Sequence, residues 1–144
     1  MYNFLLKMHS GWAYVVLIML LIATINALVG ISSKNPFTVK DKRISLFGLL
    51  SVHIQILIGV VLYFTSPNGF EKINAVGMAG MNAYDRLLAL EHPLTNIIAI
   101  TLITIGWSRH KKAADRSKFK PIAIFYGFGL LLLLSRIPWQ NWFS

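Results

Sequence analysis

Four long apolar runs dominate the sequence, at residues 11–31, 44–64, 87–107 and 121–141. A helix needs about 20 apolar residues to cross about 30 Å of hydrocarbon, so each run is long enough to span a membrane once. Of the 144 residues, 56% are hydrophobic and only 13% are charged, whereas an ordinary soluble domain has about 25% charged residues. The sequence therefore predicts an all-α integral membrane protein.

The four runs leave no room for a separate soluble domain. The expected fold is a single up-down-up-down four-helix bundle over residues 1–144, with helices at about 4–32, 39–65, 84–112 and 120–142. Thr38 followed by Asp41 resembles a capping box, which favours a start of the second helix near Val39. The connection 66–84 is the expected lid, partner surface or disordered stretch, because it is the longest in the chain.

The distribution of basic residues predicts the orientation in the membrane. Ten lysines and arginines lie in the loops 32–43 and 109–120, against one acidic residue in each loop. Loops rich in positive charge stay in the cytoplasm. Both termini and the middle connection are therefore expected on the non-cytoplasmic side of a bacterial cytoplasmic (inner) membrane. This topology and contact with anionic lipid explain the net charge of +9 without nucleic acid as a partner.

Several kinds of chemistry are excluded by composition. The chain has no cysteine, which rules out disulfides, iron–sulfur clusters, thiolate-bound zinc and c-type haem. It has no glycine-rich phosphate loop, no HExxH and no GxSxG nucleophile elbow. No catalytic residue is therefore assigned, and the sequence leaves open whether the protein is an enzyme.

The histidines are the main candidates for function, because a membrane interior penalises ionisable groups that serve no purpose. His9 lies near the outer end of the first helix, His53 near the middle of the second and His92 in the outer third of the third. His92 and His110 are 18 residues apart, about 27 Å along a helix, so they cannot bind one iron. His110 lies in SRHKK and is expected to be an ordinary interfacial residue.

Helical spacing suggests which histidines meet. At about 100° per residue, His92 shares one face with Asn96, Ala99, Ile103 and Gly106. His9 shares one face with Ala13, Val16, Leu20, Ala23 and Ala27. The first and third helices lie diagonally across an antiparallel bundle, so His9 and His92 can supply both axial ligands of a haem iron. His53 lies about 9 Å deeper than His92 by helical rise and is the second choice of partner.

Polar residues near these histidines have several expected roles. Glu91 can bond an imidazole, pair with Arg86 or Arg136, or carry protons. Arg136 suits a haem propionate or a quinone oxygen, because guanidinium binds carboxylates well. An ion pair between Arg136 and Glu91 that fixes the helix register is the structural alternative. Gln55 and Asn96 are further hydrogen-bond or proton partners.

Four motifs carry a resemblance to known proteins: HSGW, HIQILIG, EHP and GWSRHKKAA. Together they resemble a family of small four-helix bacterial membrane proteins labelled cytochrome B-like or uncharacterised. More loosely, HxQxxxG and EHP are similar to segments of b-type cytochrome modules, including the cytochrome b561 and haem A synthase groups. The resemblance implies haem held between histidines of facing helices, with His9, His53 and His92 as the positions that inherit ligation.

The expected function is therefore that of a b-type haem protein. It would act as an electron carrier or cytochrome subunit between quinol and a membrane redox partner, with haem b in the outer half of the bundle and Arg136 near the propionates. One alternative is a membrane protein in which His9, His53, Glu91 and His92 bind zinc, copper or iron. Another is a non-catalytic subunit or assembly factor of a larger membrane complex.

Overall fold

The computed structural model describes residues 1–143, and these residues form helices and turns without a strand. The α-helices are α1 (Tyr2–Ser33), α2 (Val39–Thr65), α3 (Phe70–Val76), α4 (Ala83–Arg86), α5 (His92–Lys112), α6 (Phe119–Ser135) and α7 (Trp139–Phe143). A π-helical turn, η1 (Leu87–Glu91), leads from α4 into α5, and a 3-10 turn, η2 (Asp115–Ser117), precedes α6.

Four helical segments of the described chain are long and apolar enough to cross a membrane. They cover Tyr2–Ser33, Val39–Val76, Ala83–Lys112 and Asp115–Ser135. Large apolar side chains also cover the outside of the bundle: Leu57 is 67% exposed and Leu131 is 63% exposed. Such a surface suits lipid rather than water. The expected all-α class with four helices of membrane-spanning length is confirmed.

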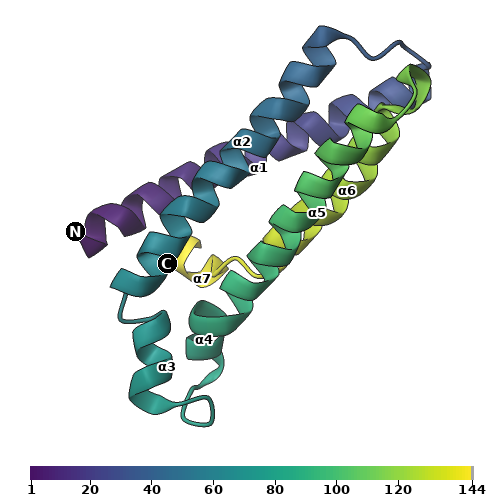
Figure 1. Cartoon of the computed structure of the whole chain (residues 1–144). Coiled ribbons are helices and arrows are strands. Elements are labelled where there is room, and N and C mark those ends of the chain that lie inside the picture. The colour runs from purple at the N-terminus through teal and green to yellow at the C-terminus, as the bar shows by residue number, and fades with distance from the viewer. Residues whose placement is uncertain (144) are drawn as a thin grey trace.

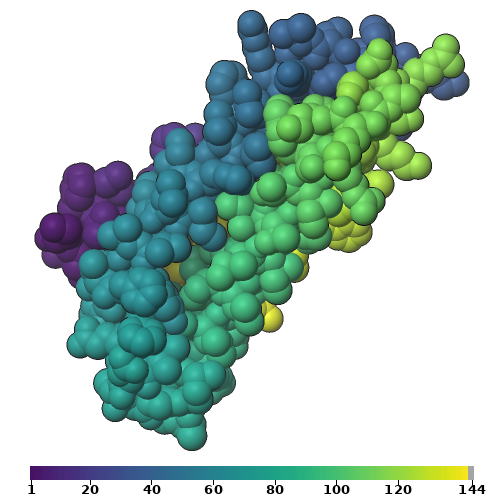
Figure 2. Space-filling view, in the orientation of Figure 1, coloured from purple at the N-terminus to yellow at the C-terminus, as the bar shows by residue number. Residues whose placement is uncertain are grey.

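The four long helices run in alternating directions, and each contacts two neighbours (Figure 1). α1 packs against α2 and α6, while α5 packs closely against α6 and less extensively against α2. α1 and α5 therefore face each other diagonally, as the sequence predicts for its first and third helices. Figure 2 shows the seam between α2 (teal) and α5 (green), where yellow atoms of the C-terminal part are visible between the two helices.

The two ends of the bundle carry different elements (Figure 1). The loops 34–38 and 113–118 lie at one end, which we call the basic end. The N-terminus, α3, α4 and α7 lie towards the other, which we call the terminal end. The capping box at the basic end is confirmed: the Thr38 amide and hydroxyl both donate to Asp41 Oδ2, at 2.8 and 2.9 Å. α2 accordingly begins at Val39.

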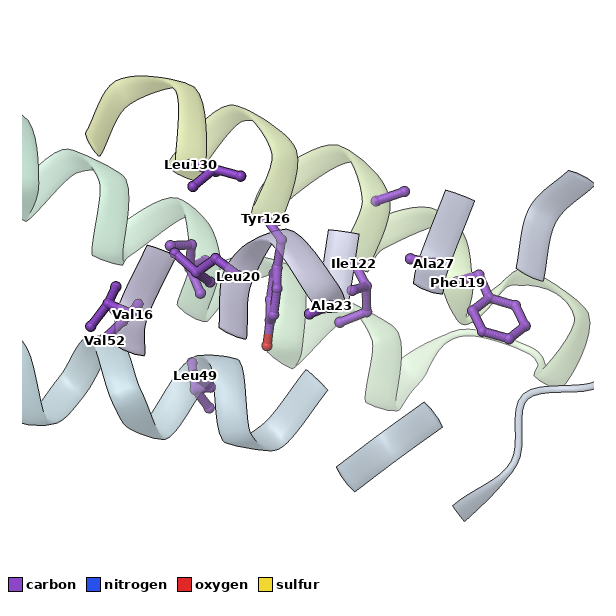
Figure 3. Packing of buried hydrophobic residues seen from close by; sticks show 12 residues of the cluster. Val16, Leu20, Ala23, Ala27, Leu49, Val52, Phe119, Ile122, Tyr126 and Leu130 are labelled. Carbon is purple, nitrogen blue, oxygen red and sulfur yellow. The ribbon is translucent and has the colours of Figure 1, made fainter. Parts of the chain in front are cut away.

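The apolar core fills the middle of the bundle and the half nearer the basic end (Figure 3). Tyr126 is fully buried in it and extends from α6 towards α2, where its hydroxyl donates to Ser45 O at 2.7 Å. Gly48 makes room for this ring, since a Cβ at that position would lie 3.3 Å from Tyr126 Cε2. One tyrosine thereby fixes the spacing of two diagonal helices.

The fourth long helix is shorter than its apolar run. The sequence places it at 120–142, but α6 ends at Ser135, and a separate short helix, α7, begins at Trp139. Pro138 accounts for the break, because proline lacks an amide donor and disfavours helical geometry in the residue before it. The expectation of one continuous helix was therefore wrong. The connection 66–84, by contrast, contains ordered helix, with α3 in its middle.

We predict that Gly106→Ala destabilises the bundle. A Cβ at Gly106 would lie 2.6 Å from Phe125 Cβ and 3.2 Å from Pro121 O, so α5 and α6 would have to separate. Overpacking of this kind typically costs about 1–3 kcal/mol. Gly11→Ala is the control, since nothing lies within 4 Å of its added methyl group. Thermal unfolding in detergent should show a lower Tm for Gly106→Ala alone; equal Tm values for both variants would contradict close α5–α6 packing.

Candidate functional site

Two histidines from diagonal helices meet in the half of the bundle near the terminal end. The ring centroids of His9, on α1, and His92, at the start of α5, are 6.1 Å apart, and the ring planes are nearly perpendicular at 87°. The two residues are 83 positions apart in the chain, so only the bundle topology brings them together. The structure thus places together the histidine pair that helical spacing favours.

Both ring nitrogens of His92 have partners. Nδ1 lies 2.8 Å from the backbone oxygen of Arg136. A carbonyl only accepts hydrogen bonds, so Nδ1 carries the proton and donates. Nε2 lies 3.0 Å from Asn96 Nδ2 and accepts a hydrogen bond from that amide. His92 is therefore held as the neutral Nδ1–H tautomer, with its lone pair on Nε2.

His9 is positioned from α2 by two residues one helical turn apart. Gln55 Nε2 donates to His9 O at 2.8 Å. Gly59 lies beneath the imidazole, since a Cβ there would be 3.2 Å from His9 Cε1. Residues four apart share a helix face, which is why one side of α2 can provide both contacts. His53 lies on a different face, as expected, and contacts α5 instead.

Three buried polar atoms of this group have no hydrogen-bond partner among the described residues. They are His9 Nδ1, Gln55 Oε1 and Asn96 Oδ1. The large majority of buried polar side-chain atoms are bonded to protein or ordered water. The four side chains form one connected set, because Gln55 contacts His9, His9 contacts His92 and His92 contacts Asn96. We call this set the histidine cluster: His9, Gln55, His92 and Asn96.

The entry into α5 is shaped by Pro93. Proline has no N–H, so α5 lacks the donor that residue 93 would offer to Ala89 O in an α-helix. The Tyr63 hydroxyl, from α2, donates to Ala89 O at 2.9 Å. The π-helical turn η1 directly precedes His92, and such turns change the direction in which helical side chains point. The sequence does not predict this role of Tyr63, because nothing in its local sequence marks it as a partner of Ala89.

Glu91 and Arg136 form an ion pair beside the histidine cluster. Arg136 Nε lies 3.6 Å from Glu91 Oε1, with the two side chains 49% and 43% exposed. An ion pair this exposed contributes little stability, typically about 0–1 kcal/mol. It does link the end of α6 to the start of α5, as the structural alternative for Arg136 predicts. The second expected pairing of Glu91, with Arg86, does not occur: Arg86 donates to Met81 O instead.

The remaining histidines lie apart from the histidine cluster. His53 Nε2 is 3.0 Å from Thr104 Oγ1, and Thr104 follows His92 by twelve residues, or about 18 Å of helical rise. The structure therefore does not bring His53 and His92 together. His110 is buried near the basic end, only 2% exposed, rather than simply lying at an interface. Its Nδ1 donates to Trp107 O, and its ring contacts Phe37.

A metal site built only from protein side chains finds no support in this arrangement. Among residues 1–143, no group of three or more histidine, aspartate or glutamate side chains is placed to hold a metal ion. His53 is too far along the bundle from His92, and Glu91 is paired with Arg136. The structure thus brings two imidazoles together at one place. Two further ligands are what an iron needs when a planar macrocycle already holds it.

Comparisons with protein-family models, with curated proteins and with solved structures find no match to this chain. The resemblance of its motifs to cytochrome B-like membrane proteins accordingly stays a prediction from the sequence. The histidine cluster is therefore the feature of the molecule that bears most directly on function.

We predict that Tyr63→Phe destabilises the protein by about 1–3 kcal/mol, because it removes the hydroxyl that donates to the carbonyl of buried Ala89. The loss should be smaller in a Pro93→Ala background, where residue 93 regains an amide that can donate to Ala89 O. A double-mutant cycle of unfolding free energies in detergent measures this coupling. An identical loss in both backgrounds would show that Tyr63 does not replace the donor absent from Pro93.

Proposed function

We propose that the chain is a b-type haem-binding membrane protein in which His9 and His92 would hold the iron. The observation that carries the proposal is the meeting of these two half-buried imidazoles from diagonal helices. Two imidazoles that held one metal ion between them through bonds of about 2.0 Å would have ring centroids about 6 Å apart. The 6.1 Å between the centroids of His9 and His92 fits that requirement.

The hydrogen bonds of His92 support the same role. A metal-bound imidazole commonly donates its second N–H to a backbone carbonyl, which fixes the tautomer and the ring orientation. His92 Nδ1 donates to Arg136 O in this way. Its Nε2 is then the ligand atom, and the Asn96 amide must rotate away to release it. His9 offers Nδ1, which has no partner among the described residues.

Charge near the cluster suits the acidic groups of haem. The guanidinium of Arg136 lies at the rim, about half exposed, and is held near His92 by the backbone of its own residue. A propionate would compete with Glu91 for this cation, since guanidinium binds either carboxylate. With the basic loops in the cytoplasm, the site lies in the outer half of the membrane.

The proposed activity is electron transfer between a quinol and a membrane redox partner, as a carrier or a cytochrome subunit. Haem supplies the one-electron chemistry when bound. The residues of this chain would provide two imidazoles to hold the group and a cation near its propionates, and such features set a haem potential.

The test is the visible spectrum of protein purified in detergent from cells supplied with haem, before and after dithionite. We expect a Soret band, and sharp α and β bands on reduction. His9→Ala and His92→Ala should each remove the low-spin spectrum, and added imidazole should restore it in part. His53→Ala is the matched control, because its ring is bonded to Thr104 and not to the histidine cluster.

Two results would contradict the proposal. The first is a featureless spectrum from wild-type protein with full helical content by circular dichroism. The second is loss of the spectrum in His53→Ala with retention in His92→Ala. Metal content without a Soret band would instead favour the alternative of a bare metal site.

A further inference from the structure

A cavity of about 400 Å³ opens at the basic end, far from the histidine cluster. It lies between the start of α2 and the end of α5, and its lining residues are Phe37, Thr38, Val39, Lys42, His110, Lys111 and Lys118. Three of these are lysines and none is acidic. The nearest carboxylate in sequence, that of Asp41, is bonded to Thr38 and to Asn26. The cavity is therefore strongly cationic.

Lys118 is fixed at this cavity by the fold. Its Nζ donates to His110 O at 3.0 Å and to Lys111 O at 3.3 Å, which satisfies carbonyls at the end of α5. The first turn of α2 contributes amide groups and the positive end of a 27-residue helix. Lys42 and Lys111 have exposed side chains and reach the same space.

His110 adds a further group to the cavity wall that can bond an anion. The residue is 2% exposed, and its Nδ1 donates to Trp107 O. Its Nε2 has no hydrogen-bond partner among the described residues, although the ring lines the cavity. Because Nδ1 already carries a proton, a second proton on Nε2 would make the ring cationic and turn Nε2 into a donor. An anion bound in the cavity would stabilise this cationic form, which burial and the three lysines otherwise disfavour.

We propose that this cavity binds a phosphate group, carried by the headgroup of an anionic lipid or by a soluble phosphate. Phosphate oxygens accept charge-assisted hydrogen bonds from several cations at once. Basic pockets at the ends of membrane helices are suited to acidic headgroups. Phe37 and Val39 give the cavity an apolar side, and Val39 is 65% exposed, which suits the glycerol and upper acyl chain of a lipid.

The experiment is native mass spectrometry and affinity titration of full-length protein in detergent. The probes are short-chain phosphatidylglycerol, short-chain phosphatidylcholine and inorganic phosphate. The test variant is Lys42→Gln with Lys111→Gln. The matched control is Lys112→Gln with Lys120→Gln, which removes the same charge from the same end without touching the cavity lining. His110→Phe keeps an aromatic ring in place and removes both ring nitrogens, including the Nδ1 donor to Trp107 O.

We expect one phosphatidylglycerol to bind per chain, at least tenfold weaker in the test variant and less than twofold weaker in the control. His110→Phe should also weaken binding in protein that keeps its full helical content by circular dichroism in lipid-free detergent. If inorganic phosphate displaces the lipid at similar concentration, the ligand is a soluble phosphate. If it does not, the ligand is a lipid headgroup.

Equal losses in both lysine pairs, or binding of phosphatidylcholine as tightly as phosphatidylglycerol, would overturn the proposal, because the attraction would then be diffuse or unspecific.

Discussion

A bilayer offers no water to the backbone, so each N–H and C=O within the bundle needs a partner in the protein. Two prolines interrupt the helical pattern near the terminal end. Pro93 removes a donor at the start of α5, and the Tyr63 hydroxyl supplies one in its place. Pro138 follows the end of α6, where the carbonyl of Arg136 is free to accept the Nδ1–H of His92. The breaks in the helices thus determine where the polar side chains point.

The half of the bundle nearer the basic end is organised by packing instead. Small residues let the helices approach closely: a methyl group on Gly129 would lie 2.6 Å from Ile103 Cγ1, and one on Gly30 would overlap the ring of Phe119. Tyr126 crosses this core with its hydroxyl satisfied by Ser45. Close packing there holds the four helices together, while the other half accommodates the polar side chains of the histidine cluster. The rigid half therefore provides the scaffold against which the histidine cluster is positioned.

Much of this arrangement follows from the sequence, and the rest follows from contacts that no local pattern encodes. The 100° spacing predicts that His92 and Asn96 share an inward face with Ala99 and Ile103, and both apolar residues are fully buried. Their diagonal position relative to α1 follows from antiparallel topology. The depth of His53 in the bundle depends on how far α2 is shifted along α5. The contact between these two helices is the least extensive in the bundle, and it sets that shift. Helical periodicity carries no information about that register.

The two histidines of the cluster differ in a way that bears on why both are present. His92 alone would serve as a cap for α6, because its donor and acceptor nitrogens are both satisfied. His9 caps nothing: its buried Nδ1 has no partner among the described residues, while Gly59 leaves space for its ring. A buried polar atom without a partner costs about 1–3 kcal/mol. A helix cap does not require that cost, whereas the proposed haem-binding role would, because a nitrogen that is to bind a metal has to stay free of other partners.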